Sequence, residues 1–146
     1  MLKSGRCIAP ADSFYSWKQV SKKGRIPHRV LQDDESLFSM AAVWEEFEDD
    51  EGHVVHTFRI ITTLAATPLA ELTPVVPFIL SESDVNRWLD PNLELEEIES
   101  ILDNPSGKRL RYYTVSPRIE NPENDNPSLI KPFSPADQFG NYSLFD

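Results

Sequence analysis

The sequence predicts a single α+β domain, residues 1–146, built on a twisted, mostly antiparallel sheet or partial barrel with two or three short helices. Three observations support this prediction. The chain has 146 residues, of which 40% are hydrophobic, enough for one core but not for two independent ones. Most apolar segments are short and rich in β-branched and aromatic residues, as strands are. Only two segments space their apolar residues like helices, and helices inserted among strands indicate the α+β class.

The first predicted element is a β-hairpin. Ser13 to Val20 is rich in aromatic and β-forming residues, and Ser21 to Gly24 is a polar turn. Pro27 to Leu31 then returns as the second strand.

A second hairpin follows. Leu37 to Phe47 is a longer apolar segment, and Val54 to Thr63 resumes with β-branched residues. The acidic run Glu48 to Gly52 between them is most simply the hairpin loop. After it, Val75 to Leu80 reads as a short buried strand.

Two helices come next. Ser81 and Asp84 fit the weaker form of a capping box at the start of the first helix, which Asp90 and Pro91 end. Its apolar stripe is Val85, Trp88 and Leu89. The second helix places an apolar stripe under a glutamate-rich face, so we expect it to pack on a sheet. That stripe is Leu95, Ile98, Ile101 and Leu102.

The last strand is predicted at Leu110 to Val115, with Tyr112 and Tyr113 pointing to opposite faces. Residues 121–146 are rich in proline, asparagine and aspartate and show no sustained period. We expect them to form an extended C-terminal covering segment.

The charge is unevenly distributed. The formal net charge of −10 argues against a broad affinity for nucleic acid. Residues 1–30, however, hold seven of the 14 basic residues and one acid, Asp12. This basic third is either a phosphate-contacting face or a solvated hairpin with lysines at its turn. Lys22, Lys23 and Arg25 are the DNA-binding candidates there.

Cysteine and histidine usage limits the chemistry. Cys7 is the single cysteine, so the sequence predicts neither an intramolecular disulfide nor a thiolate-rich metal site. His53 and His56 flank a predicted hairpin tip and do not have zinc-ligand spacing with suitable partners. We expect no metal and no cofactor. No apolar run is long enough for a bilayer and no leader pattern is visible, so a cytoplasmic protein without a membrane partner is expected.

One motif stands out. Residues Arg6 to Lys18 read Arg-Cys-Ile-Ala-Pro-Ala-Asp-Ser-Phe-Tyr-Ser-Trp-Lys. They resemble the signature Arg-Cys-(Leu or Ile)-x-Pro-Ala-Asp-Gly-Phe-(Tyr or Phe)-Glu-Trp of the SRAP family, the SOS response-associated peptidase-like proteins that react with abasic DNA. Further blocks of the same pattern follow in order over nearly the whole chain: Phe58 to Thr63, Val76 to Leu80, Trp88 to Asp90 and Val115 to Asp125.

The resemblance implies a specific nucleophile, and this chain departs from it. Family members use a cysteine at residue 2, whose thiol and α-amino group capture the aldehyde of an abasic site. Here that residue is Leu2, and the upstream family segment with its Met-Cys-Gly-Arg start is not seen. We therefore expect an N-terminally truncated SRAP-type sheet. Cys7 matches the family's second, buried cysteine and is predicted to be a small core residue.

The family's acid and base positions differ as well. Ser16 stands where the resemblance places a glutamate, and Thr73 stands where it places a histidine, so no catalytic residue is expected to be retained. Thr62 and Asn124 match site-lining positions, and Arg6 and Arg118 match polar positions that contact phosphate or satisfy strand ends. The three tryptophans could stack bases, but core packing is preferred for them: Trp17, Trp44 and Trp88.

The resemblance thus implies a protein of the DNA damage or SOS response, related to proteins that bind single-stranded DNA and crosslink to abasic sites, and here catalytically inactive. The alternative is a non-catalytic binding or structural remnant without a DNA role. An active thiol peptidase ranks last. Expected partners are single-stranded or abasic DNA, bound weakly, and a second copy or a complementing N-terminal fragment.

Overall fold

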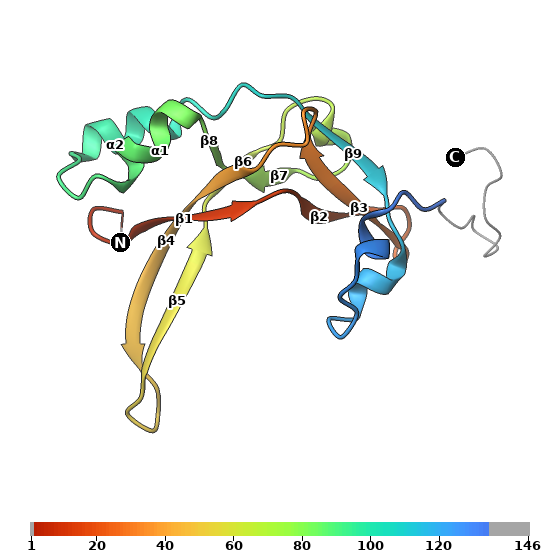
Figure 1. Ribbon diagram of the computed structural model, residues 1–146, viewed down its shortest axis with the longest axis horizontal. Coiled ribbons are helices and arrows are strands. Elements are labelled where there is room, and N and C mark those ends of the chain that lie inside the picture. The colour runs from red at the N-terminus through yellow and green to blue at the C-terminus, as the bar shows by residue number, and fades with distance from the viewer. Residues whose placement is uncertain (1, 135–146) are drawn as a thin grey trace. The chain divides into compact units, whose positions relative to one another are not determined.

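The computed structural model describes residues 2–134 (Figure 1). The chain divides into two compact units. Unit 1 comprises Met1–Asp12, Ser36–Leu64 and Val75–Lys108, and unit 2 comprises Ser13–Glu35, Ala65–Pro74 and Arg109–Asp146. Mostly antiparallel strands and two α-helices confirm the predicted α+β class. No helix of the described residues is both long and apolar enough to cross a bilayer.

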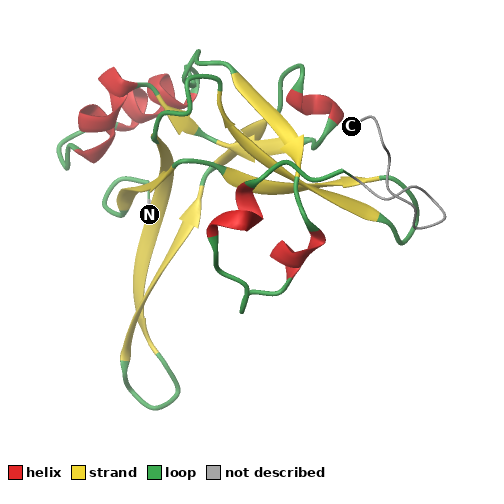
Figure 2. Ribbon diagram, turned by 45° about the vertical axis from the view of Figure 1, so that its right-hand side comes forward, coloured by secondary structure: helices red, strands yellow, loops and turns green. Residues whose placement is uncertain are grey.

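The main sheet of unit 1 has the order β1-β4-β5, with antiparallel pairing throughout. Its strands are β1 (Arg6–Ala11), β4 (Phe38–Glu48) and β5 (Val54–Ile60). Strands β4 and β5 form the predicted acidic-tipped hairpin, which stands out from the rest of unit 1 (Figures 1 and 2). At its tip the Asp49 carboxylate accepts backbone N–H groups from Glu51 and His53, both at 2.9 Å, so the acidic run closes a turn.

Two strands predicted as continuous are broken in the structure. The segment 54–63 divides into β5 and β6 (Thr62–Leu64), and the segment 75–80 divides into β7 (Val75–Pro77) and β8 (Ile79–Leu80). β7 pairs with β6, whereas β8 pairs with β4. The break lies at Phe78, whose backbone N–H donates to Ile61 and whose carbonyl accepts from Ala41. The apolar pattern alone could not reveal this change of partner.

The helices α1 (Glu82–Leu89) and α2 (Leu95–Leu102) lie side by side against the unit 1 sheet (Figures 1 and 2). Their apolar stripes bury Trp88, Ile98 and Ile101 against Ala41 and Phe78. The capping box predicted at Ser81 is wrong. Ser81 is the N-cap residue, but its hydroxyl pairs with Ser83 at 3.2 Å, and the Asp84 carboxylate accepts from Arg87 instead.

Unit 2 contains a three-stranded antiparallel sheet of order β2-β3-β9. The strands are β2 (Phe14–Gln19), β3 (Arg25–Gln32) and β9 (Leu110–Thr114), close to their predicted bounds. The central strand β3 is buried along most of its length, including Val30 and Leu31 in the core of this unit.

Three short 3-10 helices complete unit 2: η1 (Leu69–Glu71), η2 (Pro117–Glu120) and η3 (Pro127–Ile130). The segment from residue 121 is therefore not uniformly extended within the described residues. Leu129 of η3 is buried. Residues 135–146 of that segment lie outside the described part of the chain.

Candidate functional site

Cys7 is the second residue of β1, lies opposite Ala42 of β4, and is half-buried. Its carbonyl oxygen accepts a hydrogen bond of 2.8 Å from the Trp88 indole Nε1–H. Burial raises the pKa of the Cys7 thiol above its ordinary value, so the thiolate, which is the nucleophilic form, is disfavoured near neutral pH.

Arg6, a DNA-binding candidate, is buried with 9% of its surface exposed. Its guanidinium donates to the carbonyl oxygens of Trp88 at 2.7 Å and Lys3 at 3.0 Å, and also to those of Leu2 and Asp90. These acceptors include the C-terminal end of α1 and occupy all three guanidinium nitrogens. The contacts are those of a structural anchor between β1 and α1.

Ser16, at the position of the family glutamate, begins a row of three residues across the unit 2 sheet. It is half-buried on β2 and pairs in register with His28 of β3, which pairs in turn with Thr114 of β9. Directly opposed residues of antiparallel strands project to the same face, so the three polar side chains share one face of the sheet.

His28 is the central residue of that row and is 7% exposed. Its Nδ1 lies 2.9 Å from the Ile26 carbonyl, which can only accept, so Nδ1 carries the proton. Nε2 is then the acceptor and lies 3.5 Å from Thr114 Oγ1. Burial is the main cause that lowers the pKa of His28. A hydroxyl beside a neutral imidazole therefore replaces the carboxylate that the family resemblance predicts here.

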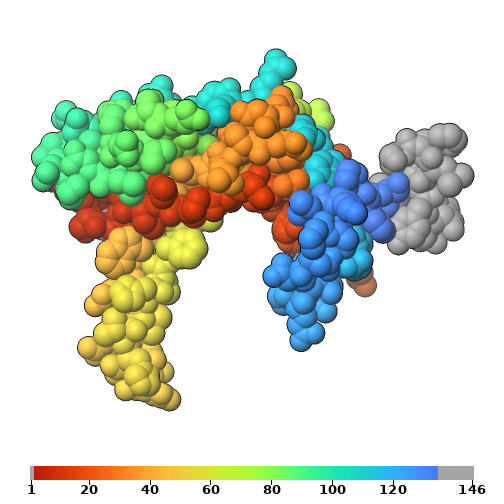
Figure 3. Space-filling model, in the orientation of Figure 1, coloured from red at the N-terminus to blue at the C-terminus, as the bar shows by residue number. Residues whose placement is uncertain are grey.

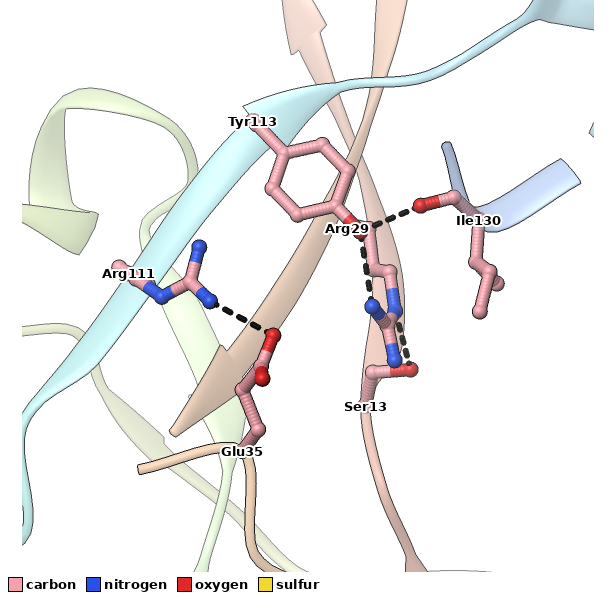
Figure 4. A network of polar contacts seen from close by, with 6 residues as sticks. All are labelled: Ser13, Arg29, Glu35, Arg111, Tyr113 and Ile130. Carbon is pink, nitrogen blue, oxygen red and sulfur yellow. Dashed lines mark hydrogen bonds and ion pairs between the residues drawn. The ribbon is translucent and has the colours of Figure 1, made fainter. Parts of the chain in front are cut away.

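Arg29 forms a second polar group in unit 2 (Figure 4). Its guanidinium donates to Ser13 Oγ at 2.9 Å and to the Tyr113 hydroxyl at 2.7 Å. The Tyr113 hydroxyl donates in turn to the Ile130 carbonyl of η3. Arg29 is 8% exposed. The network joins β3, β9 and the residue before β2 to η3, and it gives Tyr113 a structural role.

The basic turn between β2 and β3 is held by its own hydrogen bonds. Gly24 N–H donates to Ser21 Oγ at 2.8 Å, and the Val20 N–H donates to the Gly24 carbonyl at 3.0 Å. Lys22 and Lys23 are exposed at its tip. They make no ion pair within the described residues. The turn thus presents two ammonium groups to solvent.

Arg25, the third cation of this region, is placed differently. Its Nε lies 3.3 Å from Glu120 Oε1, and its guanidinium lies over the Trp17 ring, 5.1 Å from the centroid. Glu120 offsets its charge, so Arg25 is a weaker candidate for a phosphate contact than the two lysines.

The remaining candidates fall in both units. Thr73, at the position of the family histidine, belongs to unit 2, where its backbone N–H donates to the Leu69 carbonyl at 3.0 Å. Thr62 is exposed on β6 of unit 1. Arg118 and Asn124 come together in unit 2, since Asn124 Nδ2 donates to the Arg118 carbonyl at 2.9 Å.

Unit 1 also contains an apolar hollow of about 650 Å³ beside the β4-β5 hairpin. Figure 3 shows this hairpin projecting from unit 1. Trp44 and Phe58 are directly opposed across β4 and β5 and are 40% and 61% exposed. The lining is Cys7, Ile8, Ala9, Pro10, Trp44, His56, Thr57 and Phe58. Core packing is thus confirmed for Trp88, which is 0% exposed, and is wrong for Trp44.

Sequence reasoning missed His28, Arg29 and Tyr113 as polar centres. These contacts follow from the register of β3 with β2 and β9, and the register of paired strands cannot be read from a single sequence. The described residues contain no group of three or more His, Cys, Asp or Glu side chains arranged to hold a metal ion.

The fold and the retained signature define a class: an α+β protein with the arrangement of the SRAP scaffold. Residues 1–122 match the family described as SOS response associated peptidase (SRAP), and the chain belongs to that family.

Relatives with assigned names support the same family. The chain is 34% identical over 131 residues to the abasic site processing protein YoqW of Bacillus subtilis, covering 89% of this chain and 58% of that protein. It is 24% identical over 160 residues to the abasic site processing protein HMCES of Rattus norvegicus, covering 89% and 44%. The chain thus spans little more than half the length of the first relative.

Solved structures agree on the fold. A protein from Bacteroides thetaiotaomicron superposes with a TM-score of 0.78 at 28% identity, covering 90% of this chain and 58% of that one. A protein from Bordetella bronchiseptica superposes with a TM-score of 0.67 at 22% identity, covering 79% and 56%.

Proposed function

We propose that this chain contacts single-stranded DNA, including strands with abasic sites, in the DNA damage or SOS response, and that it forms no covalent bond with them. Family membership and relatives named as abasic site processing proteins support the DNA part of the proposal. The state of Cys7 carries the non-covalent part.

Cys7 is the one thiol in these 146 residues. It lies within a strand, where its nitrogen is part of a peptide bond and cannot act as the amine that completes a ring with an aldehyde. Burial raises its pKa, which disfavours the thiolate near neutral pH. A covalent capture therefore has neither a thiolate nor an adjacent free amine at this residue.

The side chains at the aligned acid and base positions support the same proposal. Ser16 and Thr73 carry hydroxyls that stay neutral near pH 7 and do not move a proton without a separate base. His28, opposite Ser16, is buried, and both of its ring nitrogens face protein groups. Thiol peptidase activity requires an activated thiolate and stays the least supported function.

For the DNA contact, Lys22 and Lys23 are the best placed cations, because they are exposed at a turn tip and unpaired within the described residues. Phosphate contacts by lysine bind without sequence preference and weaken as salt rises. Thr62, Asn124 and Arg118 are retained in the proposal as site-lining and phosphate-contacting residues. Arg6 contributes through the anchoring of β1.

The DNA contact is tested with the double variant Lys22→Glu and Lys23→Glu on a fluorescent single-stranded oligonucleotide, by anisotropy at several salt concentrations. We expect weaker binding and a slope of log K against log salt that is shallower by about 1.4, since each single-strand phosphate contact contributes roughly 0.7.

The matched control is Arg59→Glu with Lys108→Glu, which changes the net charge equally in unit 1 at two exposed, ion-paired cations. Unchanged binding in the lysine variant, or an equal loss in the control, would remove this turn from the proposal. No binding by the original chain at low salt would favour the alternative of a binding or structural protein without a DNA role.

Association with a second copy or with a complementing polypeptide segment belongs to the same proposal. The exposed aromatic side chains Trp44 and Phe58 of unit 1 support it, because contiguous exposed apolar surface is typical of interaction sites.

A further inference from the structure

Arg118 is exposed near the start of η2, yet it is held by four hydrogen bonds, one of them from the Asn121 backbone N–H to its carbonyl at 3.3 Å. Its backbone N–H donates to Ser116 Oγ at 3.2 Å, and its carbonyl accepts from Asn124 Nδ2 at 2.9 Å. Its guanidinium Nη2 donates to Ser128 Oγ at 3.3 Å. Both the main chain and the guanidinium of this surface arginine are therefore fixed.

The residues that hold Arg118 are themselves held. Asn126 Oδ1 accepts the Ser128 backbone N–H at 3.0 Å and also the Ser128 hydroxyl. Asn124 N–H donates to the Asn121 carbonyl at 3.0 Å. Several polar side chains of the segment that follows β9 thus hold one arginine in position.

This arginine lines a hollow of about 530 Å³ in unit 2. The lining residues are Ser116, Pro117, Arg118, Ser128, Lys131, Pro132 and Phe133. Among the described residues, the lining includes two cations and two hydroxyls but no carboxylate. Within the described residues neither Arg118 nor Lys131 forms an ion pair, although the whole chain carries 24 acids against 14 bases.

The chemistry of this lining matches a phosphate group. A pre-oriented guanidinium fork recognises phosphate oxygens through two parallel N–H donors, and a lysine ammonium adds a point charge. The Ser116 oxygen accepts from Arg118 and keeps its own proton to donate. The Ser128 hydroxyl already donates to Asn126, so Ser128 positions Arg118 instead.

We propose that this hollow binds a phosphate group through Arg118, Lys131 and Ser116. The group is either free phosphate or a phosphodiester of a nucleic acid strand, and the second source rests on the function proposed above.

The test uses the full 146-residue chain labelled with ¹⁵N and titrated with inorganic phosphate, with the backbone amides of Ser116, Arg118 and Ser128 observed by NMR. We expect these amides to shift and saturate. Lys131→Ala should weaken phosphate binding roughly tenfold, as expected when one charge-assisted contact is lost. Arg118→Lys keeps the charge but loses the fork, so it should weaken binding less than Arg118→Ala.

Arg111→Ala is the matched control, because Arg111 is an exposed arginine of unit 2 whose charge is paired with Glu35 at 3.0 Å. It should bind phosphate like the original chain. The proposal is overturned if the three amides do not shift, or if Lys131→Ala and Arg118→Ala bind phosphate unchanged. Amide spectra away from the hollow show whether each variant is folded.

A second titration, with an eight-nucleotide thymidine strand, separates the sources. If the strand shifts the same amides and added free phosphate reverses those shifts, the hollow binds the nucleic acid backbone. Strand binding that leaves these amides unmoved supports the proposed function but overturns the nucleic acid source. If phosphate shifts these amides but the strand does not bind at all, the hollow binds free phosphate. That result contradicts the proposed function and leaves the phosphate site intact.

Discussion

Cys7 and His28 are titratable groups that burial shifts toward their neutral forms. The pKa of the Cys7 thiol is raised and that of the His28 imidazole is lowered, with desolvation the main cause of both shifts. A neutral thiol is a poor nucleophile, and a buried neutral imidazole with both nitrogens facing protein groups is a structural residue. At the scale of single residues, burial disfavours the charged form of both groups, which supports the proposed absence of a covalent step.

His28 leads to a pH prediction. Its pKa in the folded protein lies below the ordinary value of about 6.5. As pH falls through 6.5, the unfolded chain binds a proton that the folded protein does not, so the free energy of unfolding should fall. We expect this loss between pH 7.5 and 5.5, measured by urea unfolding, to be smaller in His28→Gln.

His53→Gln is the comparison variant, since His53 is exposed at the hairpin tip beside Asp49. Between pH 7.5 and 5.5, the free energy of unfolding of His53→Gln should fall as much as that of the original chain. An equal loss of stability in His28→Gln and the original chain would mean that His28 does not cause it.

The sequence identified Ser16 and Thr73 as departures from the family pattern, because identity at an aligned position is all that this inference needs. It did not predict that Ser16 lies opposite His28, or that Tyr113 accepts from Arg29. Those facts depend on the register of β3 with β2 and β9, which only the folded sheet determines. The candidate site was therefore predictable as a set of residues and not as a set of contacts.

The attachment of α1 to β1 in unit 1 rests on Trp88 and Arg6. Trp88 is fully buried, and its indole N–H donates to the Cys7 carbonyl at 2.8 Å. The Arg6 guanidinium donates to the Trp88 carbonyl at 2.7 Å and lies over the same ring, 5.8 Å from its centroid. These contacts thus join the signature strand to the Trp-Leu-Asp block of the family pattern.

The contacts between α1 and β1 predict that two tryptophan substitutions lower the free energy of unfolding by different amounts. Trp88→Ala should lower the free energy of unfolding by about 3–5 kcal/mol, because it opens a cavity and removes the indole N–H that donates to the Cys7 carbonyl. Trp44→Ala, at a 40% exposed residue, should cost less than about 1 kcal/mol. Guanidinium chloride unfolding measures both.

Trp88→Phe keeps most of the ring volume and provides a folded reference if the alanine variant does not fold. Equal losses for Trp88→Ala and Trp44→Ala would contradict the placement of Trp88 in the core and of Trp44 on the surface.

Most elements could be predicted from local patterns, since hairpins and amphipathic helices carry their period in the sequence. The broken strands could not. Phe78 is buried and apolar like its neighbours, so the residue at which the chain leaves β6 and joins β4 looks like any other strand residue. The 3-10 turns after β9 could not be predicted, because each depends on a few hydrogen bonds, including one accepted by the side chain of Ser116 or Asn126, and has no periodic signal.

At the scale of the whole molecule, a net charge of −10 coexists with local groups of uncompensated cations. The lysines of the β2-β3 turn and the Arg118 hollow both belong to unit 2, whereas the acidic hairpin tip belongs to unit 1. This distribution supports the proposed DNA contacts through a few defined residues. The chain belongs to the SRAP family but spans 58% of its relative YoqW, so the activity of that protein is a proposal here.

The most direct test of the account is whether this 146-residue chain forms an adduct with a single-stranded oligonucleotide that contains one abasic site. Retention on the strand in a native gel should disappear completely on a denaturing gel, because Cys7 offers neither a thiolate nor an adjacent amine. A denaturation-resistant band would contradict the account. Cys7→Ala would then show the source: loss of the band would make Cys7 the nucleophile, and its persistence would place the reactive group elsewhere in the chain.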